Sequence, residues 1–155
     1  MLHIRRVSFA LTVEYRTIVV PVLRTAESEE ALVAAARLAA QRGATVVVVH
    51  VIEVPLSLPL DARLAEEQDV AESLLDDAQA LVESYGVRAV TRLLRARKAG
   101  PTIVEEVRRR NAELVLLGAP RQEMAGRGAL FGRTVDHVLR EAPCRVLVAA
   151  GKQAA

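Results

Sequence analysis

A chain of 155 residues that is 52% hydrophobic and 26% charged has the composition of one ordinary globular domain with a sizeable core. The 21 Lys and Arg residues nearly balance 19 Asp and Glu residues, and two Phe, two Tyr and no Trp leave little to stack on bases, so nucleic-acid binding is not expected. A single cysteine excludes an intrachain disulfide and a thiolate metal cluster, and no apolar run reaches the roughly 20 residues that span a membrane.

Residues 1–14 are expected to form an N-terminal arm or an extra strand, because Phe9, Leu11 and Val13 alternate along it. Its apolar stretch is at the lower limit for a signal peptide and lacks a small-residue cleavage site. We therefore expect a cytoplasmic protein without membrane insertion, whose arm is available to pair with a partner subunit.

The first part of the chain alternates strands with an amphipathic helix. Residues 17–22 and 45–52 are continuously apolar and rich in β-branched residues, which is typical of strands buried on both faces. Between them, residues 28–42 place alanines and leucines on one face, and Gly43 is expected to end this helix as its C-cap. The single histidine of the second strand, His50, is expected to be a hydrogen-bonded core residue.

A longer helix is expected over residues 61–85, with Asp61 as its N-cap and Gly86 after its end. Its predicted apolar stripe consists of Val70, Leu74, Ala78, Leu81, Val82 and Tyr85. Residues 87–94 then form a third strand, and its greater polarity indicates the edge of a sheet.

A short helix follows, and its basic run Arg108, Arg109 and Arg110 is expected on a solvated face. Residues 114–117 and 145–149 are the last two strands, and Cys144 before the second of them is expected to be a buried small hydrophobic residue. The final helix begins near residues 131–134.

This β-α-β-α-β-α-β-α-β order predicts an α/β fold, because right-handed crossovers join parallel strands. We expect a single open, doubly wound five-stranded parallel sheet in the order 3-2-1-4-5, with helices on both faces. The domain is expected over residues 15–150, followed by a short tail at 151–155.

In such a fold, ligands bind at the carboxyl ends of the strands where the strand order reverses, which here is between the first and fourth strands. The loop from Gly118 to Arg133 begins there and contains three arginines and one glutamate, whereas the rest of the chain has 18 residues of each sign. The helix after this loop has no acid before Asp136, so its N-terminus is free to attract an anion. The alternative is a loop whose glycines merely make it flexible and whose arginines are solvated.

No other motif is specific. The chain lacks the phosphate-loop pattern GxxxxGK[ST] and the dinucleotide spacing GxGxxG. Its three histidines lack the neighbours of a metal site, and no serine lies in the context of a nucleophile. We therefore expect neither a catalytic site nor a metal site, and no enzyme.

Five segments of the chain are similar to the conserved segments of a known protein family: TIVVPV, SEEAL with the alanine-rich helix, VVVVHVIEVP, AELVLLGA and GRTVDHVLREAPCRVLV. Through them, residues 15–149 resemble the universal stress protein family. The resemblance implies the same sheet, a cytoplasmic stress-response role without a known catalytic reaction, and a homodimer, often formed through the last strand (145–149).

The resemblance also implies an adenine-nucleotide site, because many members bind ATP through an Asp after the first strand and G-x2-G-x9-G-[S/T] after the fourth. Here Leu23 occupies the position of the Asp, and Arg121 that of the second glycine. Gly132 lies one residue further along the chain than the third glycine of the motif, and Arg133 follows it where the motif has Ser or Thr. A hydrogen bond to a charged group contributes roughly 1.5–3 kcal/mol, so the lost Asp alone weakens binding about 10- to 100-fold.

The predicted nucleotide-binding residues are Val22, Leu23, Val51, Gly118, Arg121, Arg127, Gly128, Gly132, Arg133 and Thr134. We expect a non-catalytic regulatory domain with weakened or altered adenine-nucleotide binding, similar to universal-stress domains associated with amino-acid permease-type transporters. One alternative is a working ATP- or AMP-type sensor in which the loop arginines hold phosphates. The other is an interaction module for a regulatory protein partner, linked to membrane transport.

Overall fold

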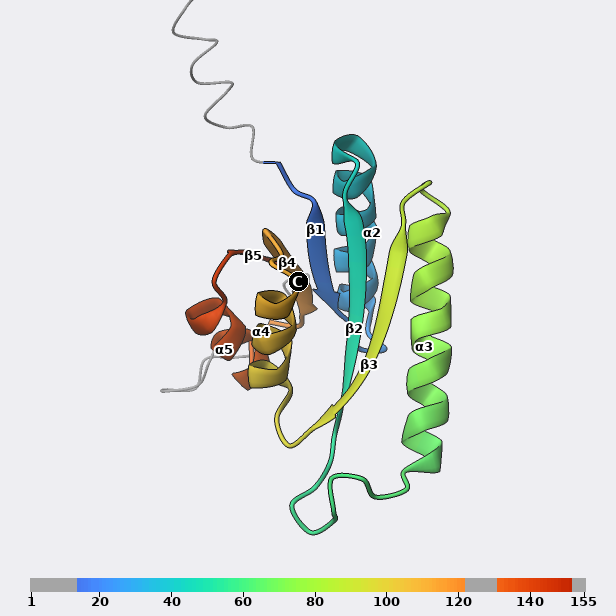
Figure 1. The fold of residues 1–155 in the computed structure, drawn as a ribbon, viewed down its shortest axis with the longest axis vertical. Helices are drawn as coiled ribbons and strands as arrows, with labels where there is room; N and C mark the ends of the chain where they lie inside the picture. Colours follow the sequence, from blue (N-terminus) through green and yellow to red (C-terminus); the bar gives the residue numbers. More distant parts are fainter. Residues whose placement is uncertain (1–13, 122–130, 152–155) are drawn as a thin grey trace, which may run out of the picture.

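Five parallel strands form the centre of the computed structural model, which describes residues 14–121 and 131–151 (Figure 1). Their spatial order is β3-β2-β1-β4-β5, and each neighbouring pair is parallel. The predicted fold class is confirmed. The strands are β1 Thr17–Pro21, β2 Thr45–Glu53, β3 Ala89–Ala96, β4 Leu114–Ala119 and β5 Arg145–Ala150. The helices are α2 Ala26–Arg42, α3 Ala65–Glu83, α4 Ala99–Arg109 and α5 Arg133–Glu141.

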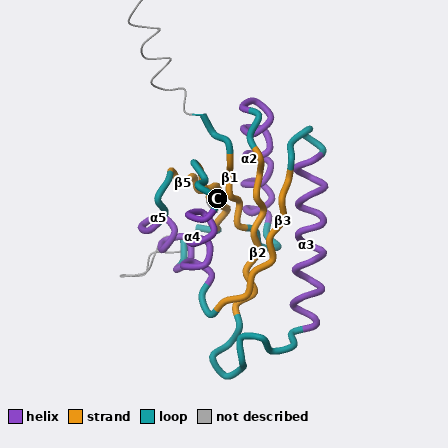
Figure 2. The backbone as a smooth tube through the Cα atoms, in the orientation of Figure 1, coloured by secondary structure: helices purple, strands orange, loops and turns teal. Residues whose placement is uncertain are grey.

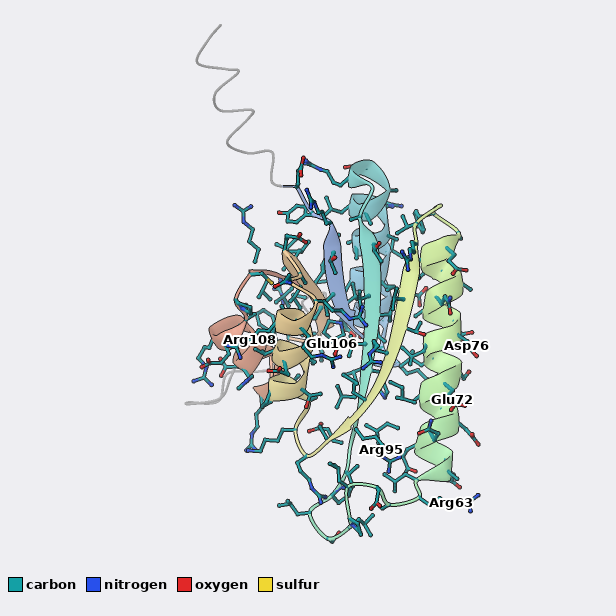
Figure 3. All side chains as sticks on the ribbon, in the orientation of Figure 1. Arg63, Glu72, Asp76, Arg95, Glu106 and Arg108 are labelled. Carbon is teal, nitrogen blue, oxygen red and sulfur yellow. The ribbon has the colours of Figure 1, made fainter. Side chains whose placement is uncertain are left out.

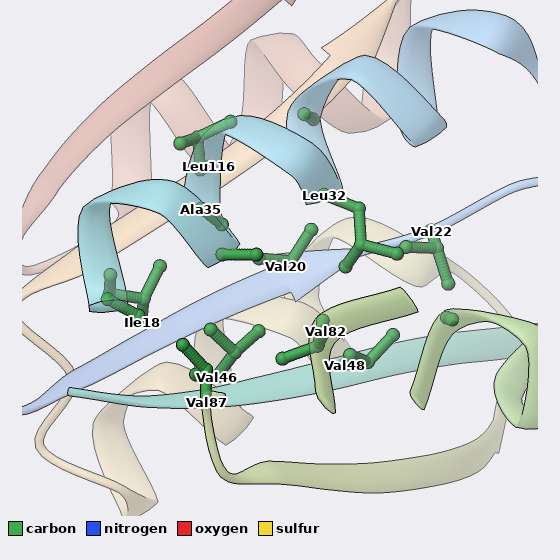
Figure 4. Close-up of a cluster of buried hydrophobic side chains, with 14 of the residues drawn as sticks. Ile18, Val20, Val22, Leu32, Ala35, Val46, Val48, Val82, Val87 and Leu116 are labelled. Carbon is green, nitrogen blue, oxygen red and sulfur yellow. The ribbon is translucent and has the colours of Figure 1, made fainter. Parts of the chain in front are cut away.

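Helices cover both faces of the sheet, α2 and α3 on one face and α4 and α5 on the other (Figure 2). Alternate residues of β1 supply the two cores: Ile18 and Val20 pack under α2 and α3, and Val19 packs under α4 and α5. The first of these cores appears in Figure 4. All three β1 residues are fully buried, as the continuous apolar pattern predicts.

The first helix begins two residues earlier than predicted, because Thr25 is its N-cap and its hydroxyl accepts a hydrogen bond from Ser28 N at 3.2 Å. Its predicted end is confirmed: Gly43 is the C-cap, with a left-handed φ of 67°. His50 Nδ1 donates to the Val22 carbonyl, 2.8 Å away, so it has the expected hydrogen bond, although its side chain is only half-buried.

The prediction for the second helix is wrong at its start. The helix begins at Ala65 with Leu64 at the N-cap, not at Asp61. Residues 54–64 are held outside the helix by β3 and the residue after it, since the Arg97 guanidinium donates to the carbonyls of Pro55 (2.6 Å) and Leu58 (2.7 Å). The Arg95 guanidinium donates to the carbonyls of Leu60 and Ala62 further along the same loop. The loop extends beyond the sheet (Figures 2 and 3).

The predicted apolar stripe of that helix is also wrong in one member, Val70, which is 53% exposed. The neighbouring Ala71 faces the sheet instead and is fully buried, because the smaller side chain allows a closer approach of the helix. Leu74, Leu81 and Tyr85 are half-buried and pack against the core, and Ala78 and Val82 are buried. The apolar pattern therefore predicts the helix, but not which residues near its N-terminus face the sheet.

Cys144 is half-buried, less than predicted, and packs against the core under α4 and α5. Burial raises the pKa of its thiol, and the nearby Glu113 carboxylate raises it further. The thiol is therefore protonated at neutral pH, as expected for a residue with a packing role. In the part of the chain that the structure describes, none of the helices combines the length and apolar character needed to cross a membrane.

A buried carboxylate joins α4 to β3. The Glu106 side chain, labelled in Figure 3, lies on α4. It is 2% exposed, and its oxygens lie 2.6 Å from Arg110 Nε, 3.3 Å from Arg92 Nε and 3.4 Å from an Arg109 guanidinium nitrogen. Two of the three basic residues predicted on a solvated face, Arg108 and Arg109, are exposed, whereas Arg110 is half-buried in this cluster. Burial favours a higher pKa for Glu106, but the hydrogen bond and charge of Arg110, with the charges of Arg92 and Arg109, outweigh it and lower the pKa below 4.5.

We expect Glu106→Gln to lower the free energy of unfolding at neutral pH by about 1–3 kcal/mol, because the three arginines lose their anion. The pKa of Glu106 is lower in the folded protein, so its ionisation stabilises the fold above about pH 4.5 and this contribution is lost as the pH falls below that value. Urea unfolding of wild type and variant between roughly pH 3 and 7 measures it. The exposed Glu105→Gln is the matched control, and an equal loss in both variants at neutral pH would contradict the assignment.

Candidate functional site

A crevice of about 280 Å³ lies at the carboxyl ends of β1 and β4, where the strand order reverses. Seven of the predicted binding residues line it: Val22, Leu23, Val51, Gly118, Gly132, Arg133 and Thr134. Arg121 is described and exposed but does not line the crevice. Arg127 and Gly128 lie outside the described residues. The structure thus brings together residues from β1, β2, α4, β4 and α5 that are up to 114 positions apart in the sequence, from Pro21 to Val135.

The walls of the crevice are mostly apolar. Val49 and Val51 of β2, Ile103 of α4 and Leu117 of β4 contribute aliphatic surface, and Phe131 adds an aromatic ring just before α5. Such a lining, with few polar groups, is typical of sites that bind small molecules. Phe131 is absent from the predicted set, although its position next to Gly132 is a usable signal.

Among the residues that the structure describes, none on the β1 side of the crevice lining carries a carboxylate. Leu23 is 57% exposed, and its backbone N–H donates to the buried Ser28 hydroxyl at 2.9 Å. The one acidic residue among the described lining residues comes instead from β2: Glu53, whose carboxylate accepts a hydrogen bond from Ala99 N at 3.3 Å. Glu53 is also absent from the predicted set, and the topology could have indicated it because β2 ends beside β1.

The N-terminus of α5 supplies positive charge. Gly132 is the N-cap, with a φ of 90° and no side-chain cap hydrogen bond, and the exposed Arg133 follows as the first helical residue. Asp136 also belongs to this first turn, but its carboxylate pairs with Arg140 at 2.8 Å. Backbone N–H groups, the helix dipole and a guanidinium therefore meet at one edge of the crevice, an arrangement that suits an anion.

A second helix N-terminus at the crevice, that of α2, already has its own cap and acidic residues. The first turn of α2 contains Glu27 and Glu29, and Thr25 caps it. Gly118 of β4 packs directly on this turn, and a Cβ atom at Gly118 would overlap the backbone of Glu27 and Ser28. Gly118 is thus required for helix-to-strand packing, a role that its place in the family motif does not reveal.

Comparison with known proteins identifies the family. The model of the universal stress protein family matches residues 14–150. The chain belongs to the universal stress protein family. A comparison with curated protein sequences found no match.

Solved universal stress proteins have the same fold. One from Archaeoglobus fulgidus is 26% identical, with a TM-score of 0.72, over 86% of this chain and 98% of that one. UspA from Lactobacillus plantarum is 24% identical, with a TM-score of 0.73, over 89% and 99%. A universal stress protein from Archaeoglobus fulgidus in complex with dAMP is 24% identical, with a TM-score of 0.69, over 88% of this chain and 98% of that one.

The packing of Gly118 gives a direct test of the site's framework. We expect Gly118→Ala to lower the free energy of unfolding by about 3 kcal/mol, because α2 must move away from β4 to admit the methyl group. Gly43→Ala is the control, since its Cβ meets nothing within 4 Å and only the left-handed backbone opposes it, at about 1 kcal/mol. Denaturant unfolding compares the two, and equal losses would show that the close packing is not limiting.

Proposed function

We propose that this universal stress protein is a non-catalytic regulatory domain of the cytoplasm that binds an adenine nucleotide with altered contacts. The observation that carries the proposal is the crevice itself, where apolar walls end at the N-terminus of α5 and Arg133. An adenine ring suits the walls and a phosphate suits the helix end. The dAMP held by the similar Archaeoglobus fulgidus protein supports this choice of ligand.

The contacts are altered because the residues that the family motif leads us to expect are replaced. Leu23 removes the carboxylate at the end of β1, and Glu53 offers one from the neighbouring strand. Arg133 lines the crevice and Arg121 does not, which supports Arg133 as the loop arginine that meets a phosphate. We propose that the nucleotide binds more weakly than the intact motif would hold it, and that its ribose meets Glu53.

Isothermal titration calorimetry of nucleotide-stripped protein tests the proposal. We expect AMP to bind, and Arg133→Ala to weaken it about 10-fold or more, because a charge-assisted contact is lost at the helix end. Arg37→Ala, on an exposed surface of α2 away from the crevice, is the matched control. Absence of binding at millimolar concentrations would overturn the proposal.

A second candidate role, as an interaction module, rests on the edge strand β5. In the described residues β5 pairs only with β4, and Leu147 on it is 50% exposed. An unpaired edge with an exposed leucine is a template for another strand. We propose a homodimer formed through residues 145–149, with the arm at residues 1–14 as the alternative element and a regulatory protein, such as a transporter, as a further partner.

We expect Leu147→Arg to convert a dimer to a monomer, because it places a charge at the centre of the paired edges. Analytical ultracentrifugation measures the mass. Leu56→Arg, at a residue that is 88% exposed on the loop before α3, is the control and should leave the mass unchanged. A variant lacking residues 1–14 distinguishes the arm, and a monomer for this variant but a dimer for Leu147→Arg would assign the interface to the arm instead.

A further inference from the structure

A second cavity, of about 370 Å³, lies between α2 and α3, on the face of the sheet opposite to α4 and α5. We refer to it as the α2–α3 pocket. Its floor is aliphatic and consists of Val22 after β1, Leu32 of α2, and Leu74, Ala78 and Leu81 of α3. All five belong to or pack against the core cluster in which Figure 4 labels Val22 and Leu32. The volume falls within the roughly 300–1,000 Å³ of typical small-molecule sites.

The wall of the α2–α3 pocket contains a buried hydroxyl group. Ser28 is 3% exposed and lines the pocket, and its hydroxyl oxygen accepts a hydrogen bond from Leu23 N at 2.9 Å. Among the residues that the structure describes, no carbonyl or side chain accepts the proton of this hydroxyl. Buried polar groups are generally hydrogen-bonded, because an unmade bond costs free energy away from water. A ligand oxygen in the pocket can accept this hydrogen bond.

Charges of both signs surround the mouth of the pocket. Arg24 precedes α2, Glu29 lies in the first turn of α2, and Asp77 lies on α3. All three are exposed, and none of them forms an ion pair with another described residue. The pocket therefore offers one cation, two anions and a hydroxyl donor around an aliphatic floor. Apolar walls with a few convergent polar groups are typical of sites that recognise one class of small molecule.

We propose that the α2–α3 pocket binds a small zwitterion with an aliphatic side chain, such as leucine or another branched-chain amino acid. The side chain packs on the aliphatic floor. The carboxylate accepts the hydrogen bond of the Ser28 hydroxyl and pairs with Arg24, and the ammonium group meets Asp77 and Glu29. A fatty acid would face two carboxylates, and an aliphatic amine would leave Arg24 and the Ser28 proton unused. The proposal does not depend on nucleotide binding.

Titrations followed by nuclear magnetic resonance test the proposal with three ligands that share one branched aliphatic group. These are leucine, 4-methylpentanoate, which lacks the ammonium group, and 3-methylbutylamine, which lacks the carboxylate. We expect leucine to bind about three- to tenfold more tightly than either analogue, because each analogue loses one charge pair at the exposed mouth. Equal affinity for leucine and 4-methylpentanoate, or no binding of leucine at millimolar concentrations, would overturn the proposal.

The same titrations locate the ligand. The pocket shares Val22, Leu23 and Ser28 with the nucleotide crevice, so the residues of α3 are the diagnostic ones. We expect the amide shifts caused by leucine to include residues 74–81 of α3. Shifts confined to the start of α5 would place the ligand in the crevice and overturn the assignment to the pocket.

Two neighbouring carboxylates of α3 provide a matched pair of variants. Asp77→Asn should weaken leucine about three- to tenfold without weakening 4-methylpentanoate, because only leucine carries the ammonium group. Asp76→Asn is the control, since Asp76 is also exposed but does not line the pocket. Arg133→Ala, which alters the crevice and not the pocket, should leave leucine binding unchanged. An equal loss in the two aspartate variants, or a loss in Arg133→Ala, would contradict the proposal. The dispersion of each spectrum establishes that the variant is folded.

Discussion

The burial of β1 on both faces is the constraint on which the rest of the molecule depends. Ile18, Val19 and Val20 have no exposed surface, so helices must cover the sheet on each side of them. With right-handed crossovers, helices cover both faces only if successive strands are added first to one side of β1 and then to its other side. Here β2 and β3 are added on one side and β4 and β5 on the other, so the strand order reverses between β1 and β4. The crevice is the direct result, because the helices on either side of the reversal diverge there.

Local sequence patterns are sufficient for the elements whose partners are close in sequence. The β-branched run of β1 and the C-cap at Gly43 are predictable from the residues themselves. The start of α3 is not, because Arg95 and Arg97, in β3 and just after it, hold the carbonyls of residues 54–64 in another conformation. The Arg97 side chain, about 40 positions further along the chain, holds the segment before the helix, so the helix propensities of the local residues cannot predict where the helix begins.

The site is predictable to the extent that topology determines it. The strand reversal alone predicts Val22 and Gly118 at the crevice, whereas Glu53 and Phe131 reach it from the end of β2 and from the residue before Gly132, positions that composition and motif spacing do not single out. Gly118 shows why a motif match needs packing information. The same glycine that resembles a ligand-binding position is required where β4 meets α2, so its presence says little about whether a nucleotide binds.

The loop before α3 has a property that reaches beyond its shape. Arg95 and Arg97 hold it through backbone carbonyls, which every amino acid provides, while Leu56, Leu58 and Leu60 are exposed to solvent. Its conformation thus depends on two arginines outside the loop as well as on its own turns, in which Leu58 N donates to Pro55 O and Ala62 N to Pro59 O. The side chains of the three exposed leucines take no part in these hydrogen bonds, so their replacement would change the chemistry of this surface and leave the contacts that hold the loop in place.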